Sequence, residues 1–254
     1  MKPENPAAFY APRNEPFFTR SGWIALAAFA FIALILLPSL YAFVPESNPL
    51  HVSAYTVTLV GKIMCYAIVA MAMNLIWGYT GILSLGHGVF FALGGYAFGM
   101  YLMRQIGREG QYQSELPDFM VFLDWKKFPW YWTNSDSFLW CAALVILVPA
   151  LLALVFGFFA FRSRIKGVYF SIITQAMTFA FMLLFFRNDT GFGGNNGFTD
   201  FKRVLGYPIT VPSTRATIFA ITALAVIGTI VLTRYLIRSK VGRVLTAIDR
   251  KSVV

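Results

Sequence analysis

Residues 78–95 read GYTGILSLGHGVFFALGG, an apolar stretch with six glycines in eighteen positions. Glycine normally weakens a helix. In a membrane helix it lets a second helix approach closely, as at the pair Gly95-x-x-x-Gly99, and it tolerates local unwinding where the backbone lines a cavity. Two interpretations therefore stay open: close packing with a tight turn at residues 78–81, or irregular backbone kept inside the protein.

The rest of the chain is similarly apolar. Of its 254 residues, 58% are hydrophobic and 13% are charged, against about 25% charged in an ordinary soluble domain. We therefore expect a membrane protein. Cys65 and Cys141 both fall within apolar runs, so they predict neither a disulfide framework nor a metal site, and no cofactor is expected.

Six segments are long and apolar enough to cross a bilayer core of about 30 Å as helices. They lie near residues 22–44, 53–77, 82–102, 138–161, 168–186 and 214–237. The third is the weakest because of its glycines. The predicted fold is all-α: a polytopic membrane helical bundle of about six transmembrane segments, interrupted by Pro38 in the first and Pro149 in the fourth.

The positive charge is distributed asymmetrically along the chain. The formal net charge is +10, and lysine and arginine gather at residues 2–20, 162–166 and 234–251, which all lie on one side of the predicted bundle. The positive-inside rule makes that side, and the N-terminus, cytoplasmic. The nearest partner of these cations is then the lipid bilayer with its anionic head groups, and no nucleic acid is expected to bind.

Polar side chains cluster around the glycines of the opening stretch. They are uncharged donors and acceptors, with His87 the one histidine among them, and no second histidine, cysteine or carboxylate is spaced to hold a metal with it. Such a cluster favours passage of a neutral or zwitterionic polar solute. The predicted translocation path consists of Asn74, Gly78, Tyr79, Thr80, Ser84, Gly86, His87 and Gly88, and the predicted helix-packing residues are Gly95 and Gly99.

Two extramembrane loops carry unusual sequences. The loop at residues 103–137 contains FPWYW at 128–132, which is typical of aromatic anchors at the water interface but also of a docking surface on the outer face. The loop at 187–213 contains TGFGGNNG at 190–197, where the glycines permit a tight turn or a backbone approach to a ligand.

Three stretches together resemble the permease subunits of ABC importers for branched-chain amino acids and urea. They are NLIWGYTGILSLGHGVFFALGGYAFGMYL at residues 74–102, KGVYFSIITQAMTF at 166–179 and SKVGRVLTAI at 239–248. The loop with FPWYW and the segment GFGGNNGFTDF at 191–201 look most like the urea-type second membrane subunit. The resemblance implies a permease subunit for a small solute, with urea in first place and a branched-chain amino acid as the alternative, in the bacterial inner membrane.

The resemblance also implies partners. They are a second homologous permease subunit, two ATP-binding subunits and an extracytoplasmic substrate-binding protein. No G-x-x-x-x-G-K-[ST] phosphate loop occurs in this chain, so ATP hydrolysis is expected on a separate chain. No catalytic constellation points to a membrane enzyme, while a self-sufficient channel or carrier remains a further alternative. The predicted ATPase-coupling residues are Gly242, Arg243, Leu245, Ala247 and Ile248, in a short amphipathic helix.

These inferences divide the chain into four parts. Residues 1–21 are a cytoplasmic tail, 22–237 a permease domain, 238–248 the coupling segment and 249–254 a tail with the sequence DRKSVV. Members of the resembled family continue past the coupling segment into further membrane helices. We therefore expect the permease domain to be truncated and residues 249–254 to be non-native, resembling translated sequencing adapter.

Overall fold

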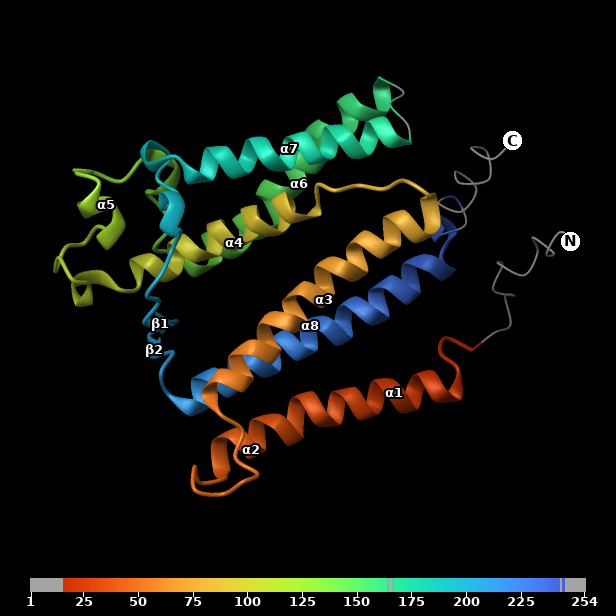
Figure 1. Cartoon of the computed structure of the whole chain (residues 1–254), viewed down its shortest axis with the longest axis horizontal. Coiled ribbons are helices and arrows are strands. Elements are labelled where there is room, and N and C mark those ends of the chain that lie inside the picture. Colours follow the sequence, from red (N-terminus) through yellow and green to blue (C-terminus); the bar gives the residue numbers. More distant parts are fainter. Residues whose placement is uncertain (1–15, 164, 166, 243, 245–254) are drawn as a thin grey trace, which may run out of the picture. The chain divides into compact units, whose positions relative to one another are not determined.

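A computed structural model describes residues 16–163, 165, 167–242 and 244, and nearly all of its regular structure is helical (Figure 1). The chain divides into two compact units. One consists of Met1–Leu75 and Ala216–Val254, and the other of Ile76–Arg215. The predicted parts at residues 1–15 and 249–254 lie outside the described residues.

The first unit contains the first predicted span. It is built from α1 (Arg20–Phe31), the π-helical turn η2 (Ile32–Leu36) and α2 (Leu37–Phe43). Thr19 caps α1, its hydroxyl accepting a hydrogen bond from the Gly22 N–H at 3.1 Å. Pro38 has no N–H to donate, and the π turn ends two residues before it, at Leu36. The first span is thus interrupted where the sequence predicts.

The core of this unit joins that span to α3 (Ala54–Thr80) and α8 (Pro212–Arg238). The buried members of the core are Ala33, Tyr41, Val57, Met64, Phe219, Ala223 and Val226. Near the other end, the Arg234 side chain donates from Nε to the carbonyl of Phe17 at 2.9 Å. The segment before α1 is therefore tied to the last turns of α8.

The second unit is built on α4 (His87–Arg104), α6 (Phe138–Arg162) and α7 (Val168–Phe186), with α4 packed against both of the others. Gly94 makes close approach to α6 possible, because a Cβ there would lie 3.4 Å from the Val145 carbonyl oxygen. At the far end of α4, a Cβ on Gly99 would come within 2.9 Å of Phe198 Cδ2.

The loops at residues 105–137 and 187–211 fold together into a small structure that we call the cap. Its elements are η3 (Gly107–Glu109), α5 (Asp118–Phe122), η4 (Trp130–Trp132), η5 (Asn188–Thr190), η6 (Gly194–Asn196), β1 (Arg203–Val204) and β2 (Tyr207–Pro208). The two strands are antiparallel, with Val204 opposite Tyr207. Its core contains Met120 and Trp132 from the first loop and Met100, Met103 and Ile106 from the end of α4 and just after it.

Five helical segments of the described chain are long and apolar enough to cross a membrane. They are Arg20–Phe43, Ala54–Thr80, Phe138–Arg162, Val168–Phe186 and Pro212–Arg238. These confirm a polytopic helical membrane protein, with bounds close to five of the six predicted segments. The third predicted segment, 82–102, differs: its helix α4 begins only at His87, after six residues without regular structure. The cytoplasmic N-terminus stays a prediction.

Candidate functional site

The break between α3 and α4 begins with the end of α3. Gly81 has φ +65°, a left-handed conformation that side chains disfavour. Thr80 occupies the last position of the helix, and its hydroxyl donates to the Ile76 carbonyl at 2.7 Å and accepts from the Ile82 N–H at 3.3 Å. Local hydrogen bonds therefore replace the next helical turn, and residues 81–86 continue as irregular backbone.

Three hydroxyl groups of α7 hold this irregular backbone. Ser171 Oγ donates to the Leu83 carbonyl at 2.7 Å, Thr174 Oγ1 accepts from the Leu85 N–H at 3.0 Å, and Thr178 Oγ1 donates to the Leu85 carbonyl at 3.0 Å. The three residues are spaced i, i+3 and i+7, so they share one face of α7. We call them the hydroxyl ladder. Backbone polar groups in a membrane need such partners, because lipid offers none.

The ladder also fixes where α4 starts. Thr178 lies near the middle of α7, which runs from Val168 to Phe186. Ser171 bonds to Leu83, and Thr174 and Thr178 bond to Leu85, so residues 83–85 lie beside the first half of α7. Since α7 is long enough to span the bilayer, α4 begins about halfway along a spanning helix. The third predicted span is therefore a discontinuous one, with irregular backbone at residues 81–86 followed by the helix α4.

The predicted path residues fall into three groups by burial. Thr80, Ser84 and Gly86 are buried, Tyr79 and His87 are half-buried, and Asn74, Gly78 and Gly88 are exposed. All except Asn74 belong to the second unit. The His87 ring folds back on the segment, with Nδ1 3.2 Å from the Ser84 carbonyl oxygen. Residues 78–88 are thus gathered by the structure, while their role in translocation stays a proposal.

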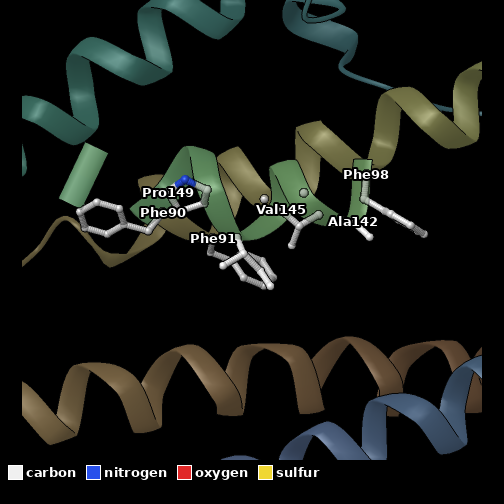
Figure 2. A pocket seen from close by; sticks show the side chains of 9 residues that line it. Phe90, Phe91, Phe98, Ala142, Val145 and Pro149 are labelled. Atoms are coloured by element: carbon white, nitrogen blue, oxygen red, sulfur yellow. The ribbon is translucent and has the colours of Figure 1, made fainter. Parts of the chain in front are cut away.

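The two predicted packing glycines have different surroundings. Gly99 contacts Phe198 of the cap, whereas no described atom lies within 4 Å of a Cβ built on Gly95. The close approach to α6 is made by Gly94 instead. Gly95 lines an apolar pocket of about 610 Å³ between α4 and α6. Figure 2 shows phenylalanines of α4 and Ala142, Val145 and Pro149 of α6 around it. No described residue therefore packs against Gly95 in the way predicted for a helix-packing glycine.

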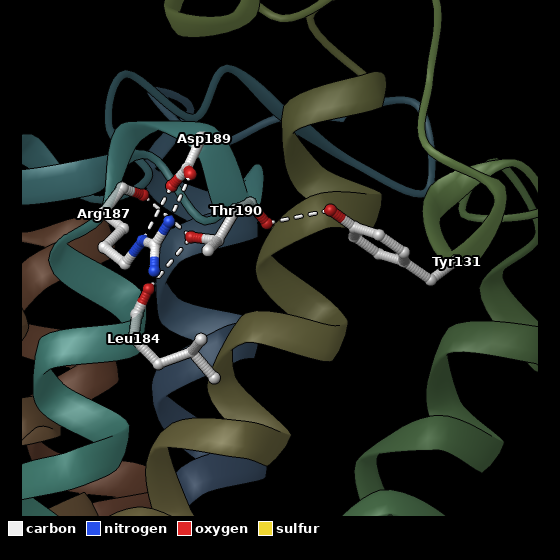
Figure 3. A network of polar contacts seen from close by, with 5 residues as sticks. All are labelled: Tyr131, Leu184, Arg187, Asp189 and Thr190. Atoms are coloured by element: carbon white, nitrogen blue, oxygen red, sulfur yellow. Dashed lines mark hydrogen bonds and ion pairs between the residues drawn. The ribbon is translucent and has the colours of Figure 1, made fainter.

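Two aromatic residues of FPWYW hold the glycine-rich loop. Trp132, 5% exposed, donates from Nε1 to the Gly191 carbonyl at 2.9 Å, and the Tyr131 hydroxyl donates to the Thr190 carbonyl at 2.9 Å (Figure 3). Trp130 in contrast is 86% exposed. The stretch therefore serves mainly to close the cap, and only Trp130 is placed to meet an interface or a partner.

An ion pair stands at the end of α7, beside these contacts. Arg187 donates to both carboxylate oxygens of Asp189, at 3.0 and 2.5 Å, and these hydrogen bonds lower the pKa of that carboxyl. Thr190 caps the helix by donating to the carbonyls of Leu184 and Arg187 (Figure 3). Partial burial, and secondarily the charge of Asp189, raise the pKa of the Tyr131 hydroxyl.

The predicted coupling segment begins with a distinct helix end. Ser239 donates its N–H to the Tyr235 carbonyl at 3.1 Å, and its hydroxyl accepts from the Val241 N–H at 3.1 Å, which ends α8 and starts a new turn. Gly242 is buried and Val244 is exposed. The other predicted coupling residues, Arg243, Leu245, Ala247 and Ile248, lie outside the described residues.

Comparison with known proteins identifies a family. Residues 55–252 match the protein family described as branched-chain amino acid transport system / permease component. The chain belongs to this permease family. It is also similar to the high-affinity branched-chain amino acid transport system permease protein LivM of Salmonella typhimurium (strain LT2). The two are 27% identical over 155 residues, which cover 61% of this chain and 29% of LivM. No solved structure matches.

Membership of the permease family agrees with the resemblance stated from the sequence. Together with the apolar helices, it places the chain in the bacterial inner membrane as a multi-pass component of a transport system. The urea-type assignment is not supported by these matches and stays a prediction. The family match also extends over residues 249–252, part of the segment predicted to be non-native.

The hydroxyl ladder joins two of the stretches on which the resemblance rests. Leu83 and Leu85 belong to residues 74–102, and Ser171, Thr174 and Thr178 belong to 166–179. These three hydroxyls are not among the site residues predicted from the sequence. Their helical spacing on one face of an apolar span is the sequence pattern that could have predicted them, because hydroxyls in a membrane span need backbone partners.

Proposed function

We propose that this chain is part of the permease subunit of an ATP-driven importer, and that its solute path runs along the discontinuous third span. One observation carries the proposal: residues 81–86 are irregular backbone, held by the hydroxyl ladder, within an otherwise helical membrane protein. Irregular backbone at membrane depth is tolerated where it is buried in protein or lines a cavity, and transport sites are commonly built there.

The solute we propose is small and carries no net charge. The helices α1, α3, α4, α6, α7 and α8 contain no aspartate or glutamate, and the predicted path residues include no lysine, arginine, aspartate or glutamate. The family description and the name of LivM favour a branched-chain amino acid. Urea, the first expectation from the sequence, is the second candidate, because both stretches that resemble the urea-type subunit meet in the cap.

The proposed partners are those that the resemblance implies. A second permease subunit completes the membrane part, two ATP-binding subunits supply the energy, and an extracytoplasmic binding protein delivers the solute. Residues 239–248 are proposed to transmit motion from the ATP-binding subunits. Replacing Arg243 with glutamate is then expected to leave ATP hydrolysis in place and abolish uptake, and unchanged uptake per ATP would remove this segment from the mechanism.

Reconstitution tests the proposed function directly. The intact permease containing this sequence is placed in proteoliposomes with its partner permease, the ATP-binding subunits and the binding protein, and uptake of labelled leucine and labelled urea is measured. We expect ATP-dependent uptake of one solute and none when the phosphate-loop lysine of the ATP-binding subunits is replaced. Equal, ATP-independent flux through the permease alone would instead establish a channel or carrier.

A further inference from the structure

The start of α4 offers free backbone donors inside the membrane region. Among the described residues, the N–H groups of His87 and Gly88 have no acceptor, while the next one, of Val89, donates to the Gly86 carbonyl at 3.1 Å. No side chain caps the helix, since the N-cap residue is Gly86. The first turn of an 18-residue helix thus points unpaired N–H groups, at the positive end of its dipole, out of the helix end.

Ser84 provides a second and independent indication of a ligand. It is only 7% exposed, yet its hydroxyl has no partner among the described residues, although the hydroxyls of the nearby ladder are all bonded. Its Oγ lies 3.8 Å from the position that a Cβ on Gly86, the N-cap residue of α4, would occupy. The Ser84 hydroxyl is not among the buried unpartnered side-chain atoms of the described residues, so its oxygen is accessible and can bond to a ligand that approaches the helix end.

The same helix end is closed on one side and open on another. A Cβ on Gly86 would meet Met177 Cε at 2.8 Å and Thr174 Cβ at 3.5 Å, so α7 covers that side. No described atom lies within 4 Å of a Cβ on Gly88. The N–H groups of His87 and Gly88 therefore lie beside open space, and a small chemical group can approach these two donors.

We propose that the first turn of α4, together with the Ser84 hydroxyl, binds the carboxylate of the solute on its way through the membrane. Helix N-termini bind anions through free N–H groups and the helix dipole, and discontinuous membrane helices direct these ends at anionic groups of substrates. With no acidic residue in α3 or α4 to compete, a carboxylate fits better than an uncharged amide. This inference rests on the proposed transport function and specifies the part of the solute that the chain recognises.

Equilibrium binding to the solubilised permease complex, without the binding protein, tests the site. Labelled leucine is the probe, with unlabelled leucine, leucinamide and urea as competitors. We expect leucine to compete, and leucinamide and urea to compete at least about tenfold less well because they lack a carboxylate. Ser84→Ala is expected to weaken leucine binding about tenfold, the order of one charge-assisted hydrogen bond, and Ser84→Thr to restore most of it.

A matched control and the uptake assay separate failure of the site from failure of the proposed function. Thr229→Ala removes a hydroxyl that bonds within its own helix, to the Ala225 carbonyl at 2.8 Å, and is expected to change nothing. Leucinamide competing as well as leucine, unchanged leucine affinity in Ser84→Ala, or no saturable leucine binding would each overturn the carboxylate site. Leucine uptake by the reconstituted importer in those cases still supports the transport function, and absence of uptake of either solute contradicts it.

Discussion

Neighbouring glycines of the opening stretch differ in their surroundings. Gly86 faces Met177 and Thr174 of α7, and Gly94 faces α6, whereas Gly88 and Gly95 have open space where a side chain would stand. The sequence alone does not distinguish these positions, because a glycine indicates only that no side chain is present. Whether the absence serves close packing or leaves room for something else depends on residues far away in the sequence.

This difference leads to a prediction for two leucine substitutions. Gly86→Leu is expected to abolish uptake and to lower the melting temperature of the permease, because the new side chain must displace Met177. Gly88→Leu is expected to abolish uptake while the melting temperature stays unchanged, because its side chain enters open space beside the helix end. Membrane insertion is checked by immunoblot and stability by thermal unfolding in detergent. Normal uptake in Gly88→Leu would contradict the proposed path.

The ion pair at the end of α7 leads to a prediction about pH. Asp189 has a lowered pKa in the folded chain, so its contribution to stability is present above the unfolded pKa of about 3.9 and is lost as pH falls through the folded value. Asp189→Asn is expected to lower the melting temperature slightly at neutral pH and not in acid below the folded pKa. Because both side chains are exposed, added salt is expected to shrink the effect. A difference in melting temperature that does not change with pH would exclude this ion pair as its cause.

At the scale of elements, hydropathy predicts the continuous spans well. The fifth predicted segment, 168–186, has the same bounds as α7. The fourth, 138–161, begins with α6 and stops one residue short of its last residue, Arg162. The bounds of the discontinuous span are harder to predict from the sequence, because glycines indicate where a helix can unwind but not where it does. Its limits are set by the hydroxyl ladder, 88 to 93 residues further along the chain. No local pattern contains that information.

The ladder leads to a prediction for a single hydroxyl. Thr174→Val keeps the side-chain shape and removes the acceptor of the Leu85 N–H, in a residue that is 1% exposed. We expect a loss of about 1–3 kcal/mol in the free energy of unfolding, the cost of an unpaired buried donor, and faster hydrogen exchange at Leu85.

Thr222→Val is the matched control for this substitution. Its hydroxyl bonds only to the Ile218 carbonyl of its own helix, at 3.0 Å, so almost no change is expected. Equal losses of unfolding free energy in both variants would mean that the loss comes from placing valine in a helix. The ladder would then not hold the irregular segment.

At the scale of the whole molecule, the described part of the chain combines apolar helices with the cap, a structure folded from two loops. The sequence predicts the two loops that form the cap but not their association, because aromatic residues near a span end are typical of the water interface. Trp132 and Tyr131 instead bond to the second loop, whose glycines at 191, 193, 194 and 197 all have positive φ. The match between these loops depends on tertiary packing, which spacing along the chain does not reveal.

The predicted orientation can be tested through the cap. With Cys65 and Cys141 replaced by alanine, Trp130→Cys places a thiol at a position that is 86% exposed. If the N-terminus is cytoplasmic, a membrane-impermeant maleimide is expected to label this cysteine in intact cells whose outer membrane has been permeabilised. Labelling that requires disruption of the inner membrane would reverse the predicted topology.

The irregular segment 81–86 also has a consequence for insertions and deletions. Removing one residue moves the following backbone groups by up to one Cα–Cα step of about 3.8 Å, whereas the three hydroxyls are held at fixed positions on the helix α7. A single deletion there would misalign all three hydroxyl contacts together. Gene variants and homologues of this chain should therefore accept changes of side chain in this segment far more readily than changes of its length.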